Sequence, residues 1–419
     1  MTSEICVMNR SAVVLAADSA ITVTRGFGDD REERYFKGAN KIFQLSDHHP
    51  VGMMVFDSAA LLQVPWEIIV KSFRKQLGVK SFNSLAEYAE EFFVFLEGNG
   101  HLFPEIIRQN ALHEAVVGAA LDLLLTVKEH HSDPAFQTEA TDDAISRAME
   151  ALEKRKFVGG LTPADLDGVI AAIGPRALDS LAKLVGEEAL PSPTKPEDLL
   201  RMATLDVLKD PDRYLTTTGL VFAGYGDHDV FPSMVEFSSS GMVLNRFVRQ
   251  EEESASVDYD RPASIKAFAQ TSMTDTFTLG FSRDVFMSLD RALNRGLRDF
   301  SNEILSKTGL DDAAIPDINA SIMGTVSTIL DEWLGVARED HSLPLRRVLA
   351  YLPIDELAEL AETLIKLQSL KEKVTKPSET VGGPVDVAVI TKHEGLVWIR
   401  RKYYFDAALN PRYLKRTGA

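Results

Sequence analysis

Strand-forming segments lie at the start, the middle and the end of this 419-residue chain, and two long blocks with helical spacing separate them. Apolar runs bounded by turn residues indicate strands within residues 1–77, 214–285 and 380–405. Residues 78–213 and 286–379 instead place apolar residues three and four positions apart, which is typical of amphipathic helices. Layer packing then favours an α+β fold, in which one β core carries two helical insertions.

The first residues of the chain predict a β-hairpin. Two short apolar runs flank the turn candidate Asn9-Arg10. If these two residues form the loop, Thr2 pairs with Ala17 in the predicted register. Asp18 then lies beside the start of the chain, by geometry alone.

A threonine at the start of a mature chain can act as a nucleophile, because its own α-amine can accept the hydroxyl proton. The pKa of an α-amine is about 7.7–8.0, so part of it is neutral at cellular pH. Removal of Met1 would create this group at Thr2. Two other polar residues, Asp18 and Lys41, have ordinary interpretations when taken alone: Asp18 as a turn cap, and Lys41 as a lysine at a strand edge.

The composition excludes several classes of protein. The formal net charge of −17 argues against nucleic acid or an anionic membrane as the main partner. We expect a cytoplasmic protein, because no secretory signal and no apolar run of membrane-spanning length is evident. The single cysteine, Cys6, lies in an apolar run and is interpreted as structural. It excludes an intramolecular disulfide and a cysteine-cluster metal site, and no metal or other cofactor is expected.

Taken together, Thr2, the run from Val13 to Ser19, Thr22 and the run from Lys41 to Phe43 resemble the proteasome β-subunit and HslV-type peptidase family. These proteins are N-terminal-nucleophile (Ntn) hydrolases. The resemblance implies an αββα four-layer sandwich, in a bacterial-type proteasome-like protein with large helical insertions. It also implies that Thr2, Asp18 and Lys41 are catalytic, and that the backbone of Thr22 pairs with substrate.

Residues 56–60 are similar to the Gly-Thr-Ala-Ala turn of that family, which makes Asp57 and Ser58 candidates for substrate binding. Four positions depart from the family pattern, and one of them is Val381, where the family has a serine. Asp57 replaces the glycine whose amide helps to hold the oxyanion, and a carboxylate there would disfavour negative charge. Gln270 and Ser378 replace an auxiliary serine and an auxiliary aspartate. The polar network that would support the nucleophile is therefore altered.

The resemblance leaves three functions open. The first is a threonine hydrolase that cleaves peptide bonds within a homo-oligomeric ring, with or without an ATPase partner. In it Thr2 attacks a carbonyl, while Lys41, held by Asp18, lowers the pKa of the threonine hydroxyl and amine. The second is a non-catalytic proteasome-like assembly or binding subunit, which a retained Met1 would favour. The third is an Ntn amidase for small amides, which a narrow closed pocket would favour.

Overall fold

The computed structural model describes residues 2–25, 32–131, 133–308, 315–375, 381–403, 405–406 and 409–412. The chain is mixed α and β, as the predicted α+β class requires. It divides into two compact units. The first unit contains residues 1–42, 230–233 and 256–419, and the second contains residues 43–229 and 234–255. The boundaries of the predicted core and insertions remain a prediction.

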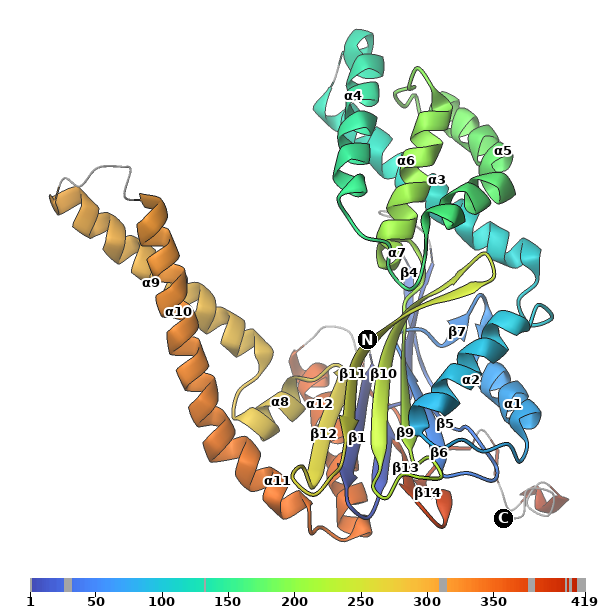
Figure 1. Ribbon diagram of the computed structural model, residues 1–419, viewed down its shortest axis with the longest axis vertical. Helices are drawn as coiled ribbons and strands as arrows, with labels where there is room; N and C mark the ends of the chain where they lie inside the picture. Colours follow the sequence, from blue (N-terminus) through green and yellow to red (C-terminus); the bar gives the residue numbers. More distant parts are fainter. Residues whose placement is uncertain are drawn as a thin grey trace. The chain divides into compact units, whose positions relative to one another are not determined.

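The first unit is built on a sheet with the strand order β12-β1-β2-β13-β14 (Figure 1). β1 pairs antiparallel with both β12 and β2, and β13 pairs antiparallel with β2 and β14. The strands are β1 (Ser3–Asn9), β2 (Val13–Ala17), β12 (Ala263–Ala269), β13 (Asp386–Thr391) and β14 (Gly395–Arg400).

One face of this sheet packs against helix α12 (Ile354–Thr375). Side chains alternate between the two faces of a strand, so Ile5 and Val7 of β1 reach the helix together with Val14 of β2. Glu4, Cys6 and Met8 alternate onto the other face, where they too are buried. Burial raises the pKa of the Cys6 thiol to about 12, which keeps this cysteine in its unreactive form.

The hairpin forms, but its register differs from the prediction. Glu4, not Thr2, is the residue opposite Ala17. The loop is displaced by one residue, because the N–H of Asn9 donates to the carbonyl of Ala12 at 3.0 Å and the Asn9 side chain accepts from the amides of Ser11 and Ala12. The resulting register shift of two residues leaves every side chain on its predicted face.

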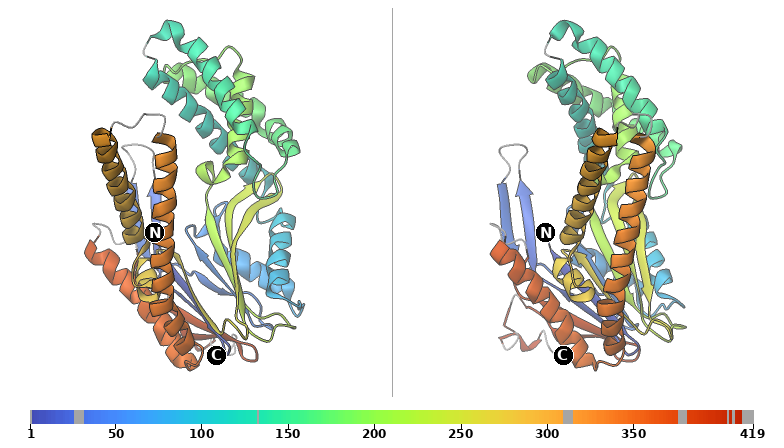
Figure 2. Two further views of the ribbon diagram at one scale, coloured as in Figure 1. Left: turned by 60° about the vertical axis from the view of Figure 1, so that its left-hand side comes forward. Right: turned by 90° about the vertical axis from the view of Figure 1, so that its left-hand side faces the viewer.

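The first unit contains further elements beyond this sheet. α9 and α10 lie along each other as a long helix pair (Figure 2). Phe286, Ile322 and Trp333 are among the side chains that pack between them. The elements are β3 (Ala20–Arg25), β4 (Glu32–Lys37), α8 (Ser272–Leu279), α9 (Arg283–Thr308), α10 (Ile315–Ala337), a π-helical turn (Arg338–Ser342) and α11 (Leu343–Leu349).

The second sheet has the strand order β11-β10-β9-β6-β5, and helices α1 and α2 pack on it through an aromatic core that includes Phe73, Phe92 and Phe222. Residues 238–241, whose Ser-Ser-Ser-Gly sequence favours a turn, lie within β10. The elements are β5 (Ile42–Gln44), β6 (Val51–Phe56), β7 (Ala60–Leu61), β8 (Val64–Pro65), α1 (Trp66–Leu77), α2 (Leu85–Gly98), β9 (Thr218–Gly224), β10 (Ser233–Val243) and β11 (Arg246–Ser256).

A group of helices completes the second unit, with its own apolar core. Helix α3 is long and apolar enough to cross a membrane by length and composition alone, which the sequence analysis did not expect. Leu112, Val116 and Leu124 of α3 are nevertheless fully buried against neighbouring helices. The helices are α3 (Glu105–His130), α4 (Pro134–Glu153), α5 (Pro163–Glu187), α6 (Pro196–Lys209) and α7 (Pro211–Tyr214).

Candidate active site

The three predicted catalytic residues lie at the ends of strands. Thr2 directly precedes β1, Asp18 directly follows β2, and Lys41 directly precedes β5. All three are buried, with exposed fractions of 5%, 1% and 4% respectively. The pairing of β1 with β2 explains the approach of Asp18, since the N–H of Asp18 donates to the carbonyl of Ser3 at 3.1 Å.

Asp18 is held by backbone amides from three parts of the first unit. Its Oδ1 accepts a hydrogen bond from the N–H of Ser3 at 3.1 Å. Its Oδ2 accepts from the N–H of Ala20 at 3.3 Å and from the N–H of Gly382 at 2.7 Å. Three backbone amides thus orient this carboxylate. The side chain of Asp18 is therefore fixed as a partner for a cation.

That cation is Lys41. Its ammonium group donates a hydrogen bond to Asp18 Oδ1, and the two side chains form a buried ion pair. The same ammonium lies 3.0 Å from Glu4 Oε1, as an ion-pair contact without the geometry of a hydrogen bond. Lys41 therefore lies between two carboxyl groups: Asp18, which was predicted from the sequence, and Glu4, which was not.

Thr2 joins this cluster through Glu4. The hydroxyl of Thr2 donates a hydrogen bond to Glu4 Oε2 at 3.2 Å. Its carbonyl accepts from the N–H of Gln270 at 3.1 Å, which ties the start of the chain to the end of β12. Glu4 thus links Lys41 to the Thr2 hydroxyl through these two contacts. In the predicted arrangement, Lys41 acts on Thr2 directly.

Glu4 is the site residue that sequence reasoning missed. Its side chain is completely buried. Burial is the main cause that raises its pKa to about 7, the charge of Asp18 raises it further, and Lys41 opposes the shift. A usable signal was present, because Glu4 directly precedes the apolar run Ile5–Met8 and, two residues after Thr2, shares its strand face.

The turn before β13 closes the site around Asp18. Gly382 supplies the amide for Asp18, and the N–H of Ser19 donates to the carbonyl of Gly382 at 3.2 Å. Gly383 has a φ of 84°, a left-handed conformation that favours glycine. An added Cβ at Gly383 would also lie 3.1 Å from the Cβ of Lys37. The Gly-Gly pair thus has a local structural purpose.

The remaining predicted site residues have varied positions. Thr22 lies in β3, where it pairs with Tyr35 of β4. Gln270 contacts Thr2 through its backbone amide, while its carbonyl accepts from the Ser3 hydroxyl at 3.4 Å. Ser378 lies outside the described residues.

Asp57 and Ser58 belong to the second unit and follow β6. Asp57 has a φ of 67°, so it occupies a conformation for which glycine is better suited. The hydroxyl of Ser58 donates to the carbonyl of Ala60 at 2.8 Å, which stabilises the turn itself. These contacts give both residues a local structural role, and their predicted role in substrate binding remains a prediction.

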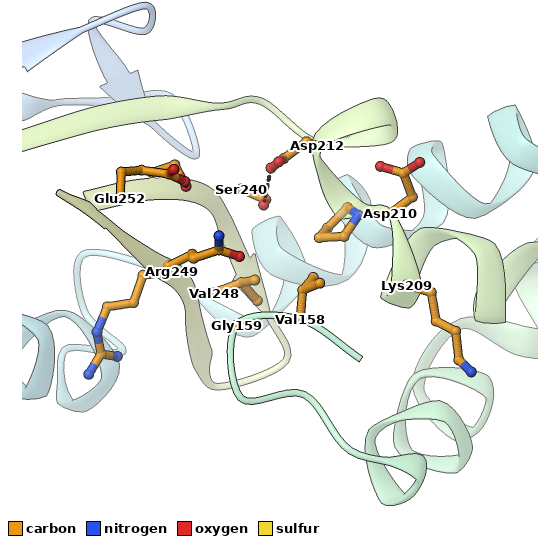
Figure 3. Close-up of a pocket in the computed structure, with 12 residues that line it drawn as sticks. Val158, Gly159, Lys209, Asp210, Asp212, Ser240, Val248, Arg249 and Glu252 are labelled. Atoms are coloured by element: carbon orange, nitrogen blue, oxygen red, sulfur yellow. Dashed lines mark hydrogen bonds between the residues drawn. The ribbon is translucent and has the colours of Figure 1, made fainter. Parts of the chain in front are cut away.

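The second unit contains a separate polar pocket of about 110 Å³ (Figure 3). Ser240 donates to Asp212 across it at 2.6 Å. The nearby cations are engaged elsewhere: Arg249 pairs with Glu90 at 2.7 Å, and Lys209 donates to backbone carbonyls. Pockets for small organic ligands are several times larger. This pocket is therefore a weaker candidate for a site of chemistry than the buried cluster around Thr2.

Comparisons with known proteins give little support for a family. No family model matches this chain, and no curated protein matches it. Solved structures that are similar at low level include two titled as Anbu proteins. One is a helical assembly of the Anbu complex from Pseudomonas aeruginosa, with 9% identity and a TM-score of 0.29, covering 99% of this chain and 92% of that one. The other is an Anbu Gly-1 mutant from Hyphomicrobium sp. strain MC1, with 9% identity and a TM-score of 0.29, covering 100% of this chain and 95% of that one.

These findings correct the family assignment. The sequence resemblance identifies the chain as a proteasome β-subunit or HslV-like Ntn hydrolase, yet no family model or curated protein matches, and the structural likeness is too low to carry that assignment. The predicted family membership is therefore wrong, and the residues of the site are the remaining basis for a function.

Proposed function

We propose that this protein is an amide hydrolase whose nucleophile is the hydroxyl of Thr2, exposed when the residues before Thr2 are removed. One observation carries the proposal: a buried chain of polar contacts runs from the Thr2 hydroxyl through Glu4 and Lys41 to Asp18. Buried charged groups are costly unless they are paired, and perturbed titratable groups concentrate at functional sites.

Each residue has a chemical task in this proposal. Thr2 Oγ attacks the carbonyl carbon of the amide, and the amine leaves while an ester forms on Thr2. Water then hydrolyses the ester and regenerates the hydroxyl. The positive charge of Lys41, held in place by Asp18, stabilises the ionised groups that develop beside Thr2 in a site with little water. Peptides are the first class of amide to test.

One observation favours a non-catalytic protein instead. Thr2 is 5% exposed, which is typical of a residue that belongs to the core and does not meet a substrate. In that second interpretation the cluster only fixes the start of β1. The two functions differ in whether the Thr2 hydroxyl reacts with an electrophile in solution.

The test combines intact mass with covalent labelling by a peptidyl β-lactone, which a reactive hydroxyl opens to form an ester. We expect the purified chain to begin at Thr2 and to gain one probe mass. Thr2→Ala should abolish the adduct. Ser3→Ala is the matched control, because it removes the neighbouring buried hydroxyl while leaving the Ser3 amide that binds Asp18. A chain that begins at Thr2 and is not labelled would exclude the proposal.

The assembly and setting of the protein remain proposals. Association of identical copies can be measured by light scattering, starting from a subunit mass of 46.3 kDa. Cytoplasmic location, protein-sized substrates and an ATPase partner are further proposals, each of which needs its own experiment.

A further inference from the structure

We propose that Glu4 is the catalytic base that takes the proton from the Thr2 hydroxyl, a role that the sequence analysis gave to the α-amine of Thr2. This inference rests on the proposed function of Thr2 as nucleophile. Its geometric basis is direct, because the Thr2 hydroxyl already donates to Glu4 Oε2 at 3.2 Å, within the range for proton transfer to a general base.

The charge balance of the cluster supports an acid–base role for Glu4. Among the described residues, the contacts of Lys41 are with two carboxyl groups, Asp18 and Glu4. Asp18 also accepts three backbone hydrogen bonds and already neutralises the lysine. Burying a second carboxyl group costs desolvation free energy, and Lys41 does not require that group, because Asp18 already pairs with it. A structural role alone therefore leaves Glu4 unexplained.

The protonation behaviour of Glu4 suits a base that works near neutral pH. Burial and the charge of Asp18 raise its pKa to about 7, against the effect of Lys41. A general base is most effective when its pKa lies near the working pH. Cys6 shares the strand face of Glu4, and Lys266 on β12 is in register with Cys6. Once the residues before Thr2 are removed, the α-amine of Thr2 is a further titratable group two residues from Glu4.

The proposed step balances in atoms and charge. The Oγ–H bond of Thr2 breaks as Oγ bonds to the carbonyl carbon, and the proton passes to the Glu4 carboxylate. The tetrahedral intermediate then collapses: its C–N bond breaks, the Glu4 carboxylic acid protonates the leaving nitrogen, and an ester remains on Thr2. In the second half, Glu4 takes a proton from the attacking water and returns it to Thr2 Oγ when the ester bond breaks.

The test measures the rate of β-lactone labelling at Thr2 between pH 5.5 and 9 in the full-length protein. For the wild type we expect a rate that rises with pH around an apparent pKa of about 7 and then levels off. Glu4→Gln keeps the size and polarity of the side chain but cannot accept the proton. It should lower the rate at pH 8 by roughly 10²–10⁴-fold and abolish the rise near 7.

Glu362→Gln is the matched control, because Glu362 is a buried glutamate of α12 that pairs with Lys366 and Arg400. It should leave the labelling profile unchanged. If Glu4→Gln does not fold, Glu4→Asp replaces it. The carboxylate then lies one methylene further from Thr2, and the rate at pH 8 should fall at least tenfold.

The outcomes separate this inference from the proposed function. Absence of labelling in the wild type overturns the role of Thr2 itself. If the wild type is labelled at Thr2 and Glu4→Gln has the same rate and pH profile, Thr2 remains the nucleophile and the role of Glu4 is overturned. An unchanged rate in Glu4→Asp has the same meaning. If the labelling rate of Glu4→Gln still rises with pH, with a midpoint near pH 8, the α-amine is the group that accepts the proton, and the role of Glu4 is again overturned.

Discussion

The carboxylate of Asp18 accepts a hydrogen bond from the backbone N–H of Gly382 at 2.7 Å. The two residues lie 364 positions apart in sequence, yet they meet because β13 pairs directly with β2. Through this contact, the carboxylate at the end of β2 is hydrogen-bonded to the turn before β13. The electrostatics of the site therefore depend on the long-range order of the sheet.

Replacing Asp18 should change the pH dependence of Thr2. In Asp18→Asn, Lys41 retains Glu4 as its only carboxylate partner among the described contacts, and a like charge that raises the pKa of Glu4 is lost. The pKa of Glu4 should fall, so the labelling rate should rise at a lower pH than in the wild type. Breaking the buried pair should also reduce the free energy of unfolding by about 3 kcal/mol. A labelling midpoint that stays in place would contradict this coupling.

Replacing Lys41 should leave two buried carboxyl groups without their cation. Lys41→Met keeps the length of the side chain, and we expect a loss of about 3–5 kcal/mol in the free energy of unfolding at pH 8.5. The loss should be smaller at pH 5.5, where Glu4 is protonated and one uncompensated charge disappears. Urea unfolding at the two pH values measures the difference, and an equal loss at both would argue against the assigned state of Glu4. Labelling at Thr2 should be lost in this variant.

The raised pKa of Glu4 also affects stability. A glutamate has a pKa near 4.5 when unfolded, and the pKa of Glu4 is about 7 in the folded protein, so the folded state binds more protons between these values. The contribution of Glu4 is most favourable below pH 4.5, and it is lost as the pH rises through 7. Relative to Glu4→Gln, the wild type should lose about 3 kcal/mol between pH 4.5 and 8, measured by denaturant unfolding. A constant difference between the two proteins would show that Glu4 does not change its protonation state in this window.

The turn that supplies the Gly382 amide should be sensitive to a single methyl group. Gly383→Ala introduces strain at a φ of 84° together with a contact of 3.1 Å to the Cβ of Lys37. It should destabilise the protein by about 1–2 kcal/mol and slow labelling at Thr2, since the neighbouring amide shifts away from Asp18.

Gly395→Ala is the control for this turn, because Gly395 has a φ of 72° and open space around it. Thermal unfolding should show a comparable strain cost in Gly395→Ala, while its labelling rate should match the wild type. Equal labelling in both variants would mean that the turn at Gly383 does not position Asp18.

Much of the local structure could be predicted from the sequence. Apolar runs and turn residues indicated strands within residues 1–77 and 380–405, and β6, β13 and β14 lie in these ranges. The register of the first hairpin was off by two because the Asn9 side chain caps the turn and moves the loop to Arg10-Ser11. A side-chain hydrogen bond of this kind leaves no trace in hydrophobic periodicity.

The candidate site shows a similar division. The spacing of Thr2, Asp18 and Lys41 indicated residues at strand ends, and the structure joins Asp18 directly to Lys41. The link between Thr2 and Lys41 was not predicted, because it passes through Glu4, a residue that the family resemblance did not mark as part of the site.

By itself, the sequence determined which segments become strands and helices, and on which strand face Thr2 and Glu4 lie, since these properties follow from local periodicity. Only the tertiary structure decided that β13 pairs with β2 and that Gly382 meets Asp18. It also decided that burial raises the pKa of Glu4 to about 7. The physical reason is that hydrogen bonds between distant segments and the loss of water around a charge arise from packing, which no local pattern of residues contains.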